Sequence, residues 1–522
     1  MAELASATGI EPATPSERPS AEVYAIFGAE PEVLAYAMAK YSRSALSLKE
    51  SLKEISQQKA EKFLNTFYFQ YGHRSIADLA HVAMAVERLS ILAAIAVADE
   101  QRWDGQERST RYQDFKKSGY FIPDFGGDEL SQDLYRTTIE ELFAEYESLS
   151  EGMFRYLAGI TPKPVDMKTE QYERTLKARA FDFSRYLLPL AANTSLGQIV
   201  NARALETQIA RLLAHTHEEV RSVGEMLKQA ATTSAYNVHR ESLEQLVEGI
   251  KDISPELGER AAQELLREIR VAPTLVKYAN ASSYEIEARR ELRHVASQLM
   301  GGIPIAAAPM VDLLNEEPLE IELAATFVYE HCYFPYRQIR QAIEAAGEVI
   351  RGEIIDMGLR HRGKHDEMQR ACCAGQQFRF DILMDIGGFR DMHRHRRCIQ
   401  IGQEFTTRHG YDVPEELQAA GVRQNYDAVM QRTAASVEKV ASRGNAESSQ
   451  YAIPLGFRKR TLFKMDFAEA VYISELRTGP AGHFSYRKAA YEMYDAVARK
   501  HPGLTKYLRV HGVKEPVDLL KR

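Results

Sequence analysis

The most basic segment of the chain carries six guanidinium and imidazole side chains within eight residues. Residues 390–397 read RDMHRHRR. If this segment is helical, Arg390, Arg394 and Arg397 share one face, because residues three and four apart are neighbours on a helix. Guanidinium forks match the paired oxygens of a phosphate group. The segment therefore predicts a site for an anionic ligand, and a solvated helix face or an ion-pair surface between subunits is the alternative.

A strand is expected just before the basic segment. Residues 378–386 alternate apolar and mostly polar side chains, which is typical of a half-buried strand. Gly387 and Gly388 are expected to break this strand. A GYDVP turn follows at residues 410–414. The strand and the turn together favour a functional interpretation of the arginines between them.

A second polar segment, residues 106–112 (QERSTRY), combines an acid, a hydroxyl and guanidinium groups. Glu107, Ser109 and Arg111 together could hold a phosphate and a planar heterocycle with donors and acceptors. A polar turn is the alternative, but a similar segment, QEFTTRH, recurs at residues 403–409.

Other catalytic signals are weak or missing. The sequence has no Walker loop, no GxGxxG after a strand and no GxSxG. The four cysteines form no CxxC pair, so we expect no disulfide framework, no zinc ribbon and, by default, a cytoplasmic location. No activating base motif lies near a cysteine. His361 and His365 are spaced for a metal, but Gly363 and cationic neighbours argue against one, and no metal is predicted.

Length and composition indicate an ordinary globular protein. The chain has 522 residues, of which 45% are hydrophobic and 27% charged, enough for about two to four domains. No apolar run approaches the roughly 20 residues that cross a bilayer, so no membrane segment is expected. The net charge of -7 argues against nucleic acid as a partner. Residues 1–20 lack a basic start and an apolar core, which predicts a disordered tail.

Four landmarks occur twice in the same order, which indicates a tandem duplication. The offsets between the paired landmarks shrink from 297 to 291, 265 and 229 residues, as expected if the second copy has shorter connections. We place copy one at residues 21–285 and copy two at 286–522, with a helix over 286–299 opening copy two. The landmark pairs are QERSTRY and QEFTTRH, YFIP (120–123) and YDVP (411–414), YLLPL (186–190) and YAIPL (451–455), and PTLVKY (273–278) and PGLTKY (502–507).

These landmarks resemble the motifs of the flavin-dependent thymidylate synthase (ThyX) family, over nearly the whole chain beyond the tail. The family motif RHRxxSxNExSxRY is preceded by a GHxS segment and followed by RxxLPL, NxR and LR segments. Copy one matches its back half and the flanking segments at 72–75, 106–112, 185–190 and 201–203. At the front of the motif copy one has Asp99, Glu100 and Gln101. Copy two has a literal RHR at 394–396 and an LR at 476–477.

The resemblance implies an α+β fold of two tandem ThyX-like copies, each a small antiparallel sheet flanked by long helices. Sites in this family lie between subunits, so the partly complementary losses predict a hybrid site that draws on both copies. The family is a homotetramer of single copies, and a duplicated chain is expected to form an equivalent four-copy assembly as a homodimer.

The resemblance also implies the reaction, a reductive methylation of dUMP to dTMP with FAD as cofactor and NADPH and methylenetetrahydrofolate as co-substrates. Arg477 is expected to stabilise negative charge on the uracil and Ser109 to act beside it. The nucleotide would be bound by Glu107, Ser109, Arg111, Arg185 and Arg477. The flavin would be bound by His73, Ser75, Gln106, Asn201, Arg203, Arg394, His395 and Arg396.

Two alternatives remain open at the level of the sequence. A flavoenzyme of this family could act on another pyrimidine nucleotide or add something other than a methyl group. The altered residues Asp99, Glu100, Gln101 and Asp104 keep this alternative open. A non-catalytic homologue that binds flavin or nucleotide is the other.

Overall fold

The computed structural model describes residues 24–26, 28–40, 47–54, 60, 64, 74–100, 102–283, 286–287, 290, 309–313, 318–329, 336–360, 372, 378–513 and 517–520. The tail predicted at residues 1–20 and most of the helix predicted at 286–299 lie outside these residues. So do His73, His361 and His365.

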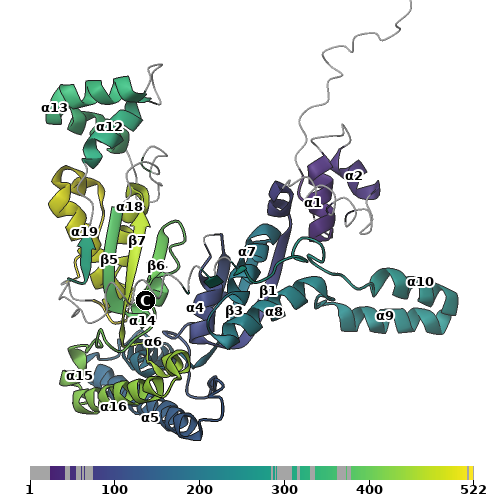
Figure 1. Ribbon diagram of the computed structural model, residues 1–522, viewed down its shortest axis with the longest axis horizontal. Helices are drawn as coiled ribbons and strands as arrows, with labels where there is room; N and C mark the ends of the chain where they lie inside the picture. Colours follow the sequence, from purple (N-terminus) through teal and green to yellow (C-terminus); the bar gives the residue numbers. More distant parts are fainter. Residues whose placement is uncertain are drawn as a thin grey trace, which may run out of the picture.

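Copy one forms a three-stranded antiparallel sheet with helices around it (Figure 1). The strands are β1 (His81–Ser90), β2 (Asp104–Glu107) and β3 (Asn193–Asn201), and β3 lies in the middle. The helices are α1 (Pro31–Ala39), α2 (Leu48–Glu54), η4 (Arg74–Leu79), α4 (Ile91–Ala98), α5 (Glu129–Ile160), α6 (Thr169–Ser184), η5 (Arg185–Leu187), α7 (Ala202–Leu213), α8 (Glu218–Thr232), α9 (Arg240–Ile253) and α10 (Pro255–Leu265).

Copy two repeats this plan with a four-stranded antiparallel sheet in the order β4-β5-β7-β6. Its strands are β4 (Val311–Leu313), β5 (Phe378–Asp385), β6 (Ile399–Gly402) and β7 (Arg458–Met465). The described helices are α12 (Leu319–Tyr329), α13 (Tyr336–Leu359), α14 (Ile386–Met392), α15 (Glu416–Ala419), α16 (Arg423–Ser442), α17 (Ala446–Ser449), η7 (Gln450–Ala452), α18 (Phe467–Arg477), α19 (Phe484–Lys500) and η8 (Pro502–Tyr507). Two small antiparallel sheets with long helices confirm the expected α+β fold.

The strand predicted from the alternation at residues 378–386 is β5, and its apolar side chains are buried as expected. Phe378, Phe380 and Ile382 are each 0% exposed. The same periodicity holds in its neighbour β7, where buried and half-buried residues alternate along the strand.

The glycines after β5 do not end the strand as expected, because Asp385 ends it. Asp385 is the N-cap of α14, and its Oδ1 accepts a hydrogen bond from the backbone N–H of Gly388 at 2.6 Å. Gly388 lies in the first turn of α14, where a Cβ atom would come within 2.7 Å of the Ser485 hydroxyl. The predicted shared helical face of Arg390, Arg394 and Arg397 is also wrong, because α14 ends at Met392.

The two copies meet where the repeated LPL and IPL segments pair with each other. Leu190 donates its backbone N–H to the Ile453 carbonyl at 3.0 Å, and Leu455 donates to the Leu188 carbonyl at 3.0 Å. An antiparallel bridge joins Pro189 to Pro454 between these two bonds. The bonds are reciprocal, so the copies are related by a local twofold relationship at these prolines.

Two length differences explain why the landmark offsets shrink. Copy one connects its second and third landmarks through α5 and α6, of 32 and 16 residues, where copy two has α16 and α17, of 20 and 4 residues. Copy one also inserts the hairpin of α9 and α10, which projects from the body in Figure 1. Copy two has η8 directly after α19.

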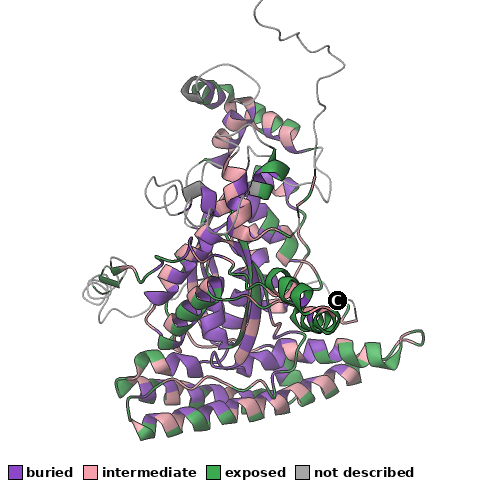
Figure 2. Cartoon of the chain, turned by 90° about the vertical axis from the view of Figure 1, so that its right-hand side faces the viewer, coloured by how far each residue is buried: buried purple, intermediate pink, exposed green. Residues whose placement is uncertain are grey.

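Long helices cover the junction between the copies. Tyr135, Ile139, Leu142 and Tyr146 form a buried stripe on α5 at helical spacing, and α5 packs against α16 of copy two. Figure 2 shows long helices of this kind with buried inner faces and exposed outer faces. Among the described residues, no helix is both long and apolar enough to span a bilayer.

Candidate functional site

A cleft rich in arginine lies where the turn after β2 of copy one meets α14 of copy two. We call it the arginine cleft. It has only about 10 Å³ of open space, enough for about one water molecule. Its lining comes from both copies and consists of Glu107, Arg108, Ser109, Thr110, Arg111, Arg185, Gly387, Arg390, Asp391 and Arg394.

One wall of the cleft is a buried ion pair between the copies. Arg390 Nη2 of copy two donates to Glu107 Oε2 of copy one at 2.7 Å, and both side chains are less than 10% exposed. The Nε atom of Arg390 is buried and has no partner among the described residues. Arg390 therefore has a hydrogen-bond donor left over, although it is already paired.

Arg185 begins η5 and is almost completely buried beneath the cleft. Its Nη1 donates to Asp391 Oδ2 at 3.1 Å. Its Nε and Nη2 atoms are buried without a partner among the described residues. Unsatisfied buried donors on a guanidinium are costly unless a ligand or water accepts from them.

Arg111 is held by three groups. Its Nε donates to Asp182 Oδ1 at 2.8 Å, its Nη1 to the Tyr486 hydroxyl at 2.9 Å and its Nη2 to the Ala481 carbonyl at 3.2 Å. Burial opposes the charge, but the Asp182 carboxylate outweighs it and raises the pKa of Arg111. The guanidinium is therefore permanently charged and fixed in orientation.

Asp391 pairs with Arg185 and lies in the electrostatic field of further arginines. Burial alone would raise its pKa, but four guanidiniums together hold the pKa of Asp391 below its ordinary value. They are those of Arg185, Arg111, Arg394 and Arg477. Asp391 is thus ionised.

Ser109 shapes the turn that carries Arg111. Its Oγ accepts a hydrogen bond from the Arg111 backbone N–H at 3.2 Å. Thr406 makes the same bond to the N–H of Arg408 at 3.2 Å in copy two. The repeated turn geometry supports the equivalence of the two polar segments.

Arg477 lies beside the cleft and is held from behind by His395. Arg477 Nε donates to His395 Nε2 at 2.7 Å, and His395 Nδ1 lies 3.4 Å from Glu469 Oε1. Burial lowers the pKa of His395, and Arg477 adds to this effect. These contacts fit a neutral imidazole with its proton on Nδ1. His395 therefore orients Arg477 and does not itself line the cleft.

Family models of known proteins match both copies. The family described as "Thymidylate synthase complementing protein" matches residues 26–234 and 312–503. The chain belongs to this family. The two matched regions agree with the tandem repeat found in the sequence.

Full-length relatives share the length of the chain. A UPF0159 protein of Chlamydia pneumoniae is 28% identical over 507 residues, covering 90% of this chain and 88% of that protein. A UPF0159 protein of Thermoplasma acidophilum is 22% identical over 509 residues, covering 90% and 93%. A flavin-dependent thymidylate synthase of Clostridium tetani is 24% identical over 177 residues, covering 34% of this chain and 67% of that protein.

Solved structures of single-copy length match part of the chain. A flavin-dependent thymidylate synthase from Helicobacter pylori, complexed with FAD and dUMP, has 14% identity and a TM-score of 0.23, covering 39% of this chain and 89% of that one. A UMP/dUMP methylase from Streptomyces cacaoi, bound with 5-Br dUMP, has 15% identity and a TM-score of 0.27, covering 38% and 84%.

The structure gathers part of the set of site residues predicted from the family resemblance. Glu107, Ser109, Arg111, Arg185 and Arg394 line the arginine cleft, and Arg477 lies beside it. Residues from copy one and copy two thus share one cleft, as the hybrid-site prediction requires. The ligand roles of these residues stay predictions.

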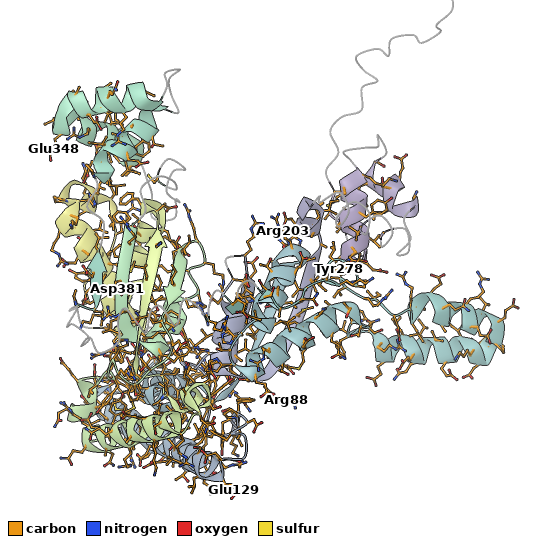
Figure 3. The ribbon with its side chains drawn as sticks, in the orientation of Figure 1. Arg88, Glu129, Arg203, Tyr278, Glu348 and Asp381 are labelled. Carbon is orange, nitrogen blue, oxygen red and sulfur yellow. The ribbon has the colours of Figure 1, made fainter. Side chains whose placement is uncertain are left out.

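The other described residues of the predicted set do not line the cleft. The Arg396 guanidinium lies 4.0 Å from the centre of the Trp103 ring, and burial lowers the pKa of Arg396 to about 10. Asn201 caps α7, and Arg203, labelled in Figure 3, pairs with Asp78 at 3.1 Å. Gln106 is an exposed residue of β2. Ser75 lies on η4, and its side chain is outside the described part of the structure.

Sequence reasoning missed the groups that hold the arginines. Asp182 and Tyr486 orient Arg111, and Asp391 orients Arg185. Glu469 orients His395 and, through His395, Arg477. The available signal was Asp182, an acid in the last turn of α6 and three residues before Arg185, which accepts a hydrogen bond from Arg111. For the thiol alternative, burial raises the pKa of Cys398 to about 12, so this thiol stays protonated.

The structure also aligns the RHR segment of copy two with copy one. Arg477 contacts His395 in copy two, and Arg211 Nε contacts Glu100 Oε1 at 2.9 Å in copy one. Each arginine lies near the end of the helix after the central strand, α18 or α7. Counted from the equivalent helix caps Ser90 and Asp385, His395 corresponds to Glu100, and the literal RHR corresponds to residues 99–101.

Proposed function

We propose that the chain is a flavin-dependent thymidylate synthase that methylates dUMP, with the nucleotide bound at the arginine cleft. The observation that carries this proposal is the cleft itself. Five arginines of the two copies line it between α14 and the Ser109 turn, and the Asp391 carboxylate among them pairs with Arg185. The similarity to a flavin-dependent thymidylate synthase of Clostridium tetani supports the reaction type.

The phosphate of dUMP is expected to bind where Asp391 lies. Arg185 keeps two buried donors without partners, and Arg390 keeps one. A phosphate dianion that enters can accept from these donors, and Asp391 then has to turn away. The small open volume of the cleft means that the nucleotide binds with this rearrangement.

Arg477 is expected to contact the uracil. Methylation at C5 of uracil places negative charge on the ring oxygens, and a preoriented guanidinium stabilises such charge. The contact with neutral His395 fixes the Arg477 side chain, while Glu469 holds His395 in turn. Ser109 and Glu107 are expected to orient the nucleotide at the opposite wall.

The residues present fit a bound flavin dinucleotide near the same place. The buried Nε atom of Arg396 has no partner among the described residues, which suits a phosphate oxygen of the flavin. Arg394 and Arg396 would hold FAD, with Asn201 and Arg203 of copy one or of a second chain. When bound, FAD supplies the hydride chemistry, with NADPH as reductant and methylenetetrahydrofolate as carbon donor.

The alternative is that the substrate is a pyrimidine nucleotide other than dUMP. Copy one carries Asp99, Glu100 and Gln101 at the positions of the RHR segment, so one of the two equivalent sites has changed. The change leaves the family's chemistry at the arginine cleft intact and leaves the identity of the base open.

The deciding experiment incubates the purified full chain with FAD, NADPH, methylenetetrahydrofolate and radiolabelled dUMP. Labelled dTMP is the expected product. Parallel reactions with UMP and dCMP test the alternative, and a methylated product from one of these alone favours it. Bound FAD that NADPH reduces, with no methylated nucleotide from any substrate, contradicts the synthase proposal. Light scattering during gel filtration tests the expected homodimer.

A further inference from the structure

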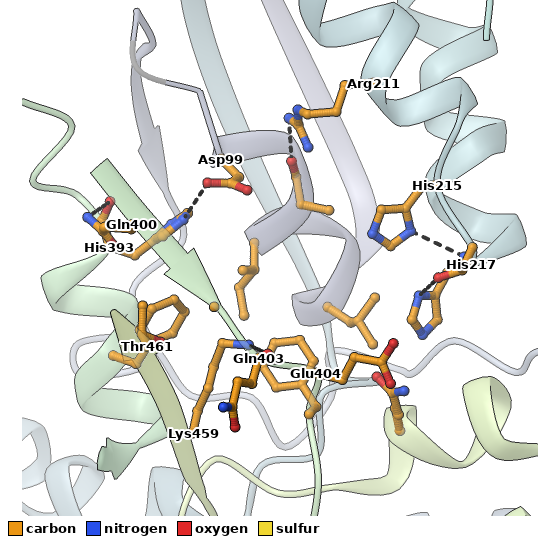
Figure 4. A pocket seen from close by; sticks show the side chains of 18 residues that line it. Asp99, Arg211, His215, His217, His393, Gln400, Gln403, Glu404, Lys459 and Thr461 are labelled. Atoms are coloured by element: carbon orange, nitrogen blue, oxygen red, sulfur yellow. Dashed lines mark hydrogen bonds and ion pairs between the residues drawn. The ribbon is translucent and has the colours of Figure 1, made fainter. Parts of the chain in front are cut away.

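The local twofold relationship gives the arginine cleft a counterpart elsewhere in the chain. The counterpart combines α4 of copy one with β6, β7 and the polar segment of copy two. It is an open cavity of about 380 Å³, within the usual range of small-molecule sites. We call it the Lys459 cavity (Figure 4).

Equivalent positions show that the Lys459 cavity has lost its phosphate-binding residues. Ser90 and Asp385 cap α4 and α14 in the same way. Counting from these caps, Ile95 corresponds to Arg390 and Asp99 to Arg394. At the start of η7, Gln450 stands where Arg185 begins η5. Ile95, Asp99 and Gln450 all line the cavity.

A different cation has appeared in the Lys459 cavity. Lys459 is 6% exposed, and its Nζ donates to the Gln403 carbonyl. Among the described residues it has no ion-pair partner within 4 Å. A buried ammonium with one hydrogen bond keeps two donors for a ligand. Gly402 makes room for this side chain, because a Cβ there would lie 3.1 Å from Lys459 Cε.

Two further polar atoms in the lining lack partners. Thr461 is 2% exposed, and its hydroxyl has no hydrogen bond among the described residues. The same is true of the buried Gln400 Oε1, although the amide nitrogen of Gln400 donates to the His395 carbonyl at 3.0 Å. Buried polar atoms without partners are rare unless a ligand or water satisfies them.

The aromatic and aliphatic part of the lining suits a flat ring system, while Asp99, Glu404, Arg211 and three histidines make up most of its polar rest. Lys459 Nζ lies 4.0 Å from the centre of the Phe405 ring and 5.4 Å from that of Phe389. Leu92 and Ile95 add apolar surface from copy one. Aromatic rings beside a cation and a few hydrogen-bonding atoms recognise planar ligands with one anionic group.

We propose that the Lys459 cavity binds a planar, two-ring heteroaromatic carboxylate that carries no phosphate. The carboxylate pairs with Lys459, and a ring oxygen or nitrogen meets Thr461 and Gln400. The rings lie against Phe389 and Phe405. The arginine cleft and the Lys459 cavity are then two equivalent places that have diverged toward different ligands.

The test uses isothermal titration calorimetry of the full chain with two probes. The first is kynurenate (4-hydroxyquinoline-2-carboxylate), and the second is 4-hydroxyquinoline, which lacks the carboxylate. We expect kynurenate to bind at least about tenfold more tightly than 4-hydroxyquinoline, the range of one charge-assisted hydrogen bond. Saturating dUMP is expected to leave kynurenate binding unchanged.

Variants on strand β7 assign the binding to the cavity. Lys459→Met is expected to abolish the preference for kynurenate, and Thr461→Val to weaken both probes about threefold or more. Lys464→Met, on the opposite face of β7, is the matched control and should behave as the unsubstituted chain. Thermal melts followed by circular dichroism check that each variant folds. If Lys459→Met does not fold, the result for Thr461→Val decides the test.

Three results would overturn the proposal. They are no kynurenate binding to the unsubstituted chain, equal affinity for the two probes, and displacement of kynurenate by dUMP. Kynurenate binding that survives both Lys459→Met and Thr461→Val would also overturn it.

Discussion

Ser485 donates a hydrogen bond to the buried carboxylate of Asp385. The counterpart of this pair in copy one is Ser90 and Glu219, in which the acid and the hydroxyl have exchanged positions. In copy one, Ser90 caps α4 and donates to Glu219 of α8. In copy two, Asp385 caps α14 and accepts from Ser485 of α19. Each copy thus has one acid at this junction, but the acid lies on the packed helix α8 in copy one and at the helix cap in copy two.

Asp385 is expected to make stability depend on pH. Burial, helped by Asp412, raises the pKa of Asp385 to about 6, above the ordinary value near 3.9. Between about pH 4 and pH 6 the folded chain binds more protons than the unfolded chain, so stability falls as pH rises through this window. Asp385→Asn is expected to be about 1–3 kcal/mol more stable than the unsubstituted chain above about pH 6, with no such gain below about pH 4. Urea unfolding across this range measures the difference.

The half-exposed Asp427 on α16 provides the control for that measurement. Asp427→Asn should change stability by less than about 0.5 kcal/mol at every pH. A stability difference for Asp385→Asn that is the same at all pH values would contradict the role given to the Asp385 charge.

The buried pair of Glu107 and Arg390 is expected to couple the two copies energetically. Glu107→Gln removes the carboxylate and leaves the Arg390 charge buried without its partner. We expect a loss of about 3 kcal/mol, and a smaller loss when Arg390→Met is added, because the double variant has no unpaired charge. A double-mutant cycle by urea unfolding measures this coupling. In the same cycle, the coupling energy of the surface pair of Arg423 and Asp427 should be under about 1 kcal/mol. Equal coupling energies in both pairs would refute the expectation.

Arg111 and its counterpart Arg408 allow a matched test of where the nucleotide binds. Arg111 is buried and makes four hydrogen bonds to three groups, which lysine cannot reproduce, whereas Arg408 is exposed. Arg111→Lys is expected to weaken dUMP binding about tenfold or more, and Arg408→Lys to change it less than about twofold. Calorimetry gives both affinities. The opposite ranking would move the nucleotide to the copy-two turn.

Local patterns predicted the elements that follow from short-range periodicity. The alternation of Phe378, Phe380 and Ile382 predicted β5, and the paired landmarks predicted two copies of one fold. The helical face of the basic segment was wrong, because neither the Asp385 cap nor the end of α14 at Met392 shows in a periodicity argument. Arg394 nevertheless reaches the predicted cleft, from the turn after the helix.

Contacts between distant residues could not be predicted from one sequence. Arg111 bonds to Tyr486 across 375 residues, and Arg390 bonds to Glu107 across 283. No motif signals the Lys459 cavity, because its polar, ionisable and apolar side chains come from distant segments brought together by the twofold relationship. The family motif pointed to the arginines, while the acids that orient them appear only in the folded chain.

Asp391 is expected to compete with the phosphate of the nucleotide. Its carboxylate shares four guanidiniums that a phosphate would also need. Asp391→Asn keeps the shape of the side chain and removes the charge, so dUMP should bind about fivefold more tightly while deoxyuridine is unaffected. Calorimetry with both ligands measures this. Weaker dUMP binding would show instead that Asp391 is needed to position Arg185.

His395 is expected to act on turnover through Arg477. His395→Leu removes the acceptor of Arg477 Nε, so the guanidinium loses its fixed position beside the uracil. We expect kcat to fall about 10- to 100-fold while the Kd for dUMP changes less than about threefold, because oriented charge matters most in the transition state. His395→Gln, which offers another acceptor, should recover part of kcat. Glu100→Leu removes the equivalent partner of Arg211 in copy one and should leave kcat unchanged. Equal losses from His395→Leu and Glu100→Leu would show that the two positions only stabilise their helices, and that His395 does not position a catalytic arginine.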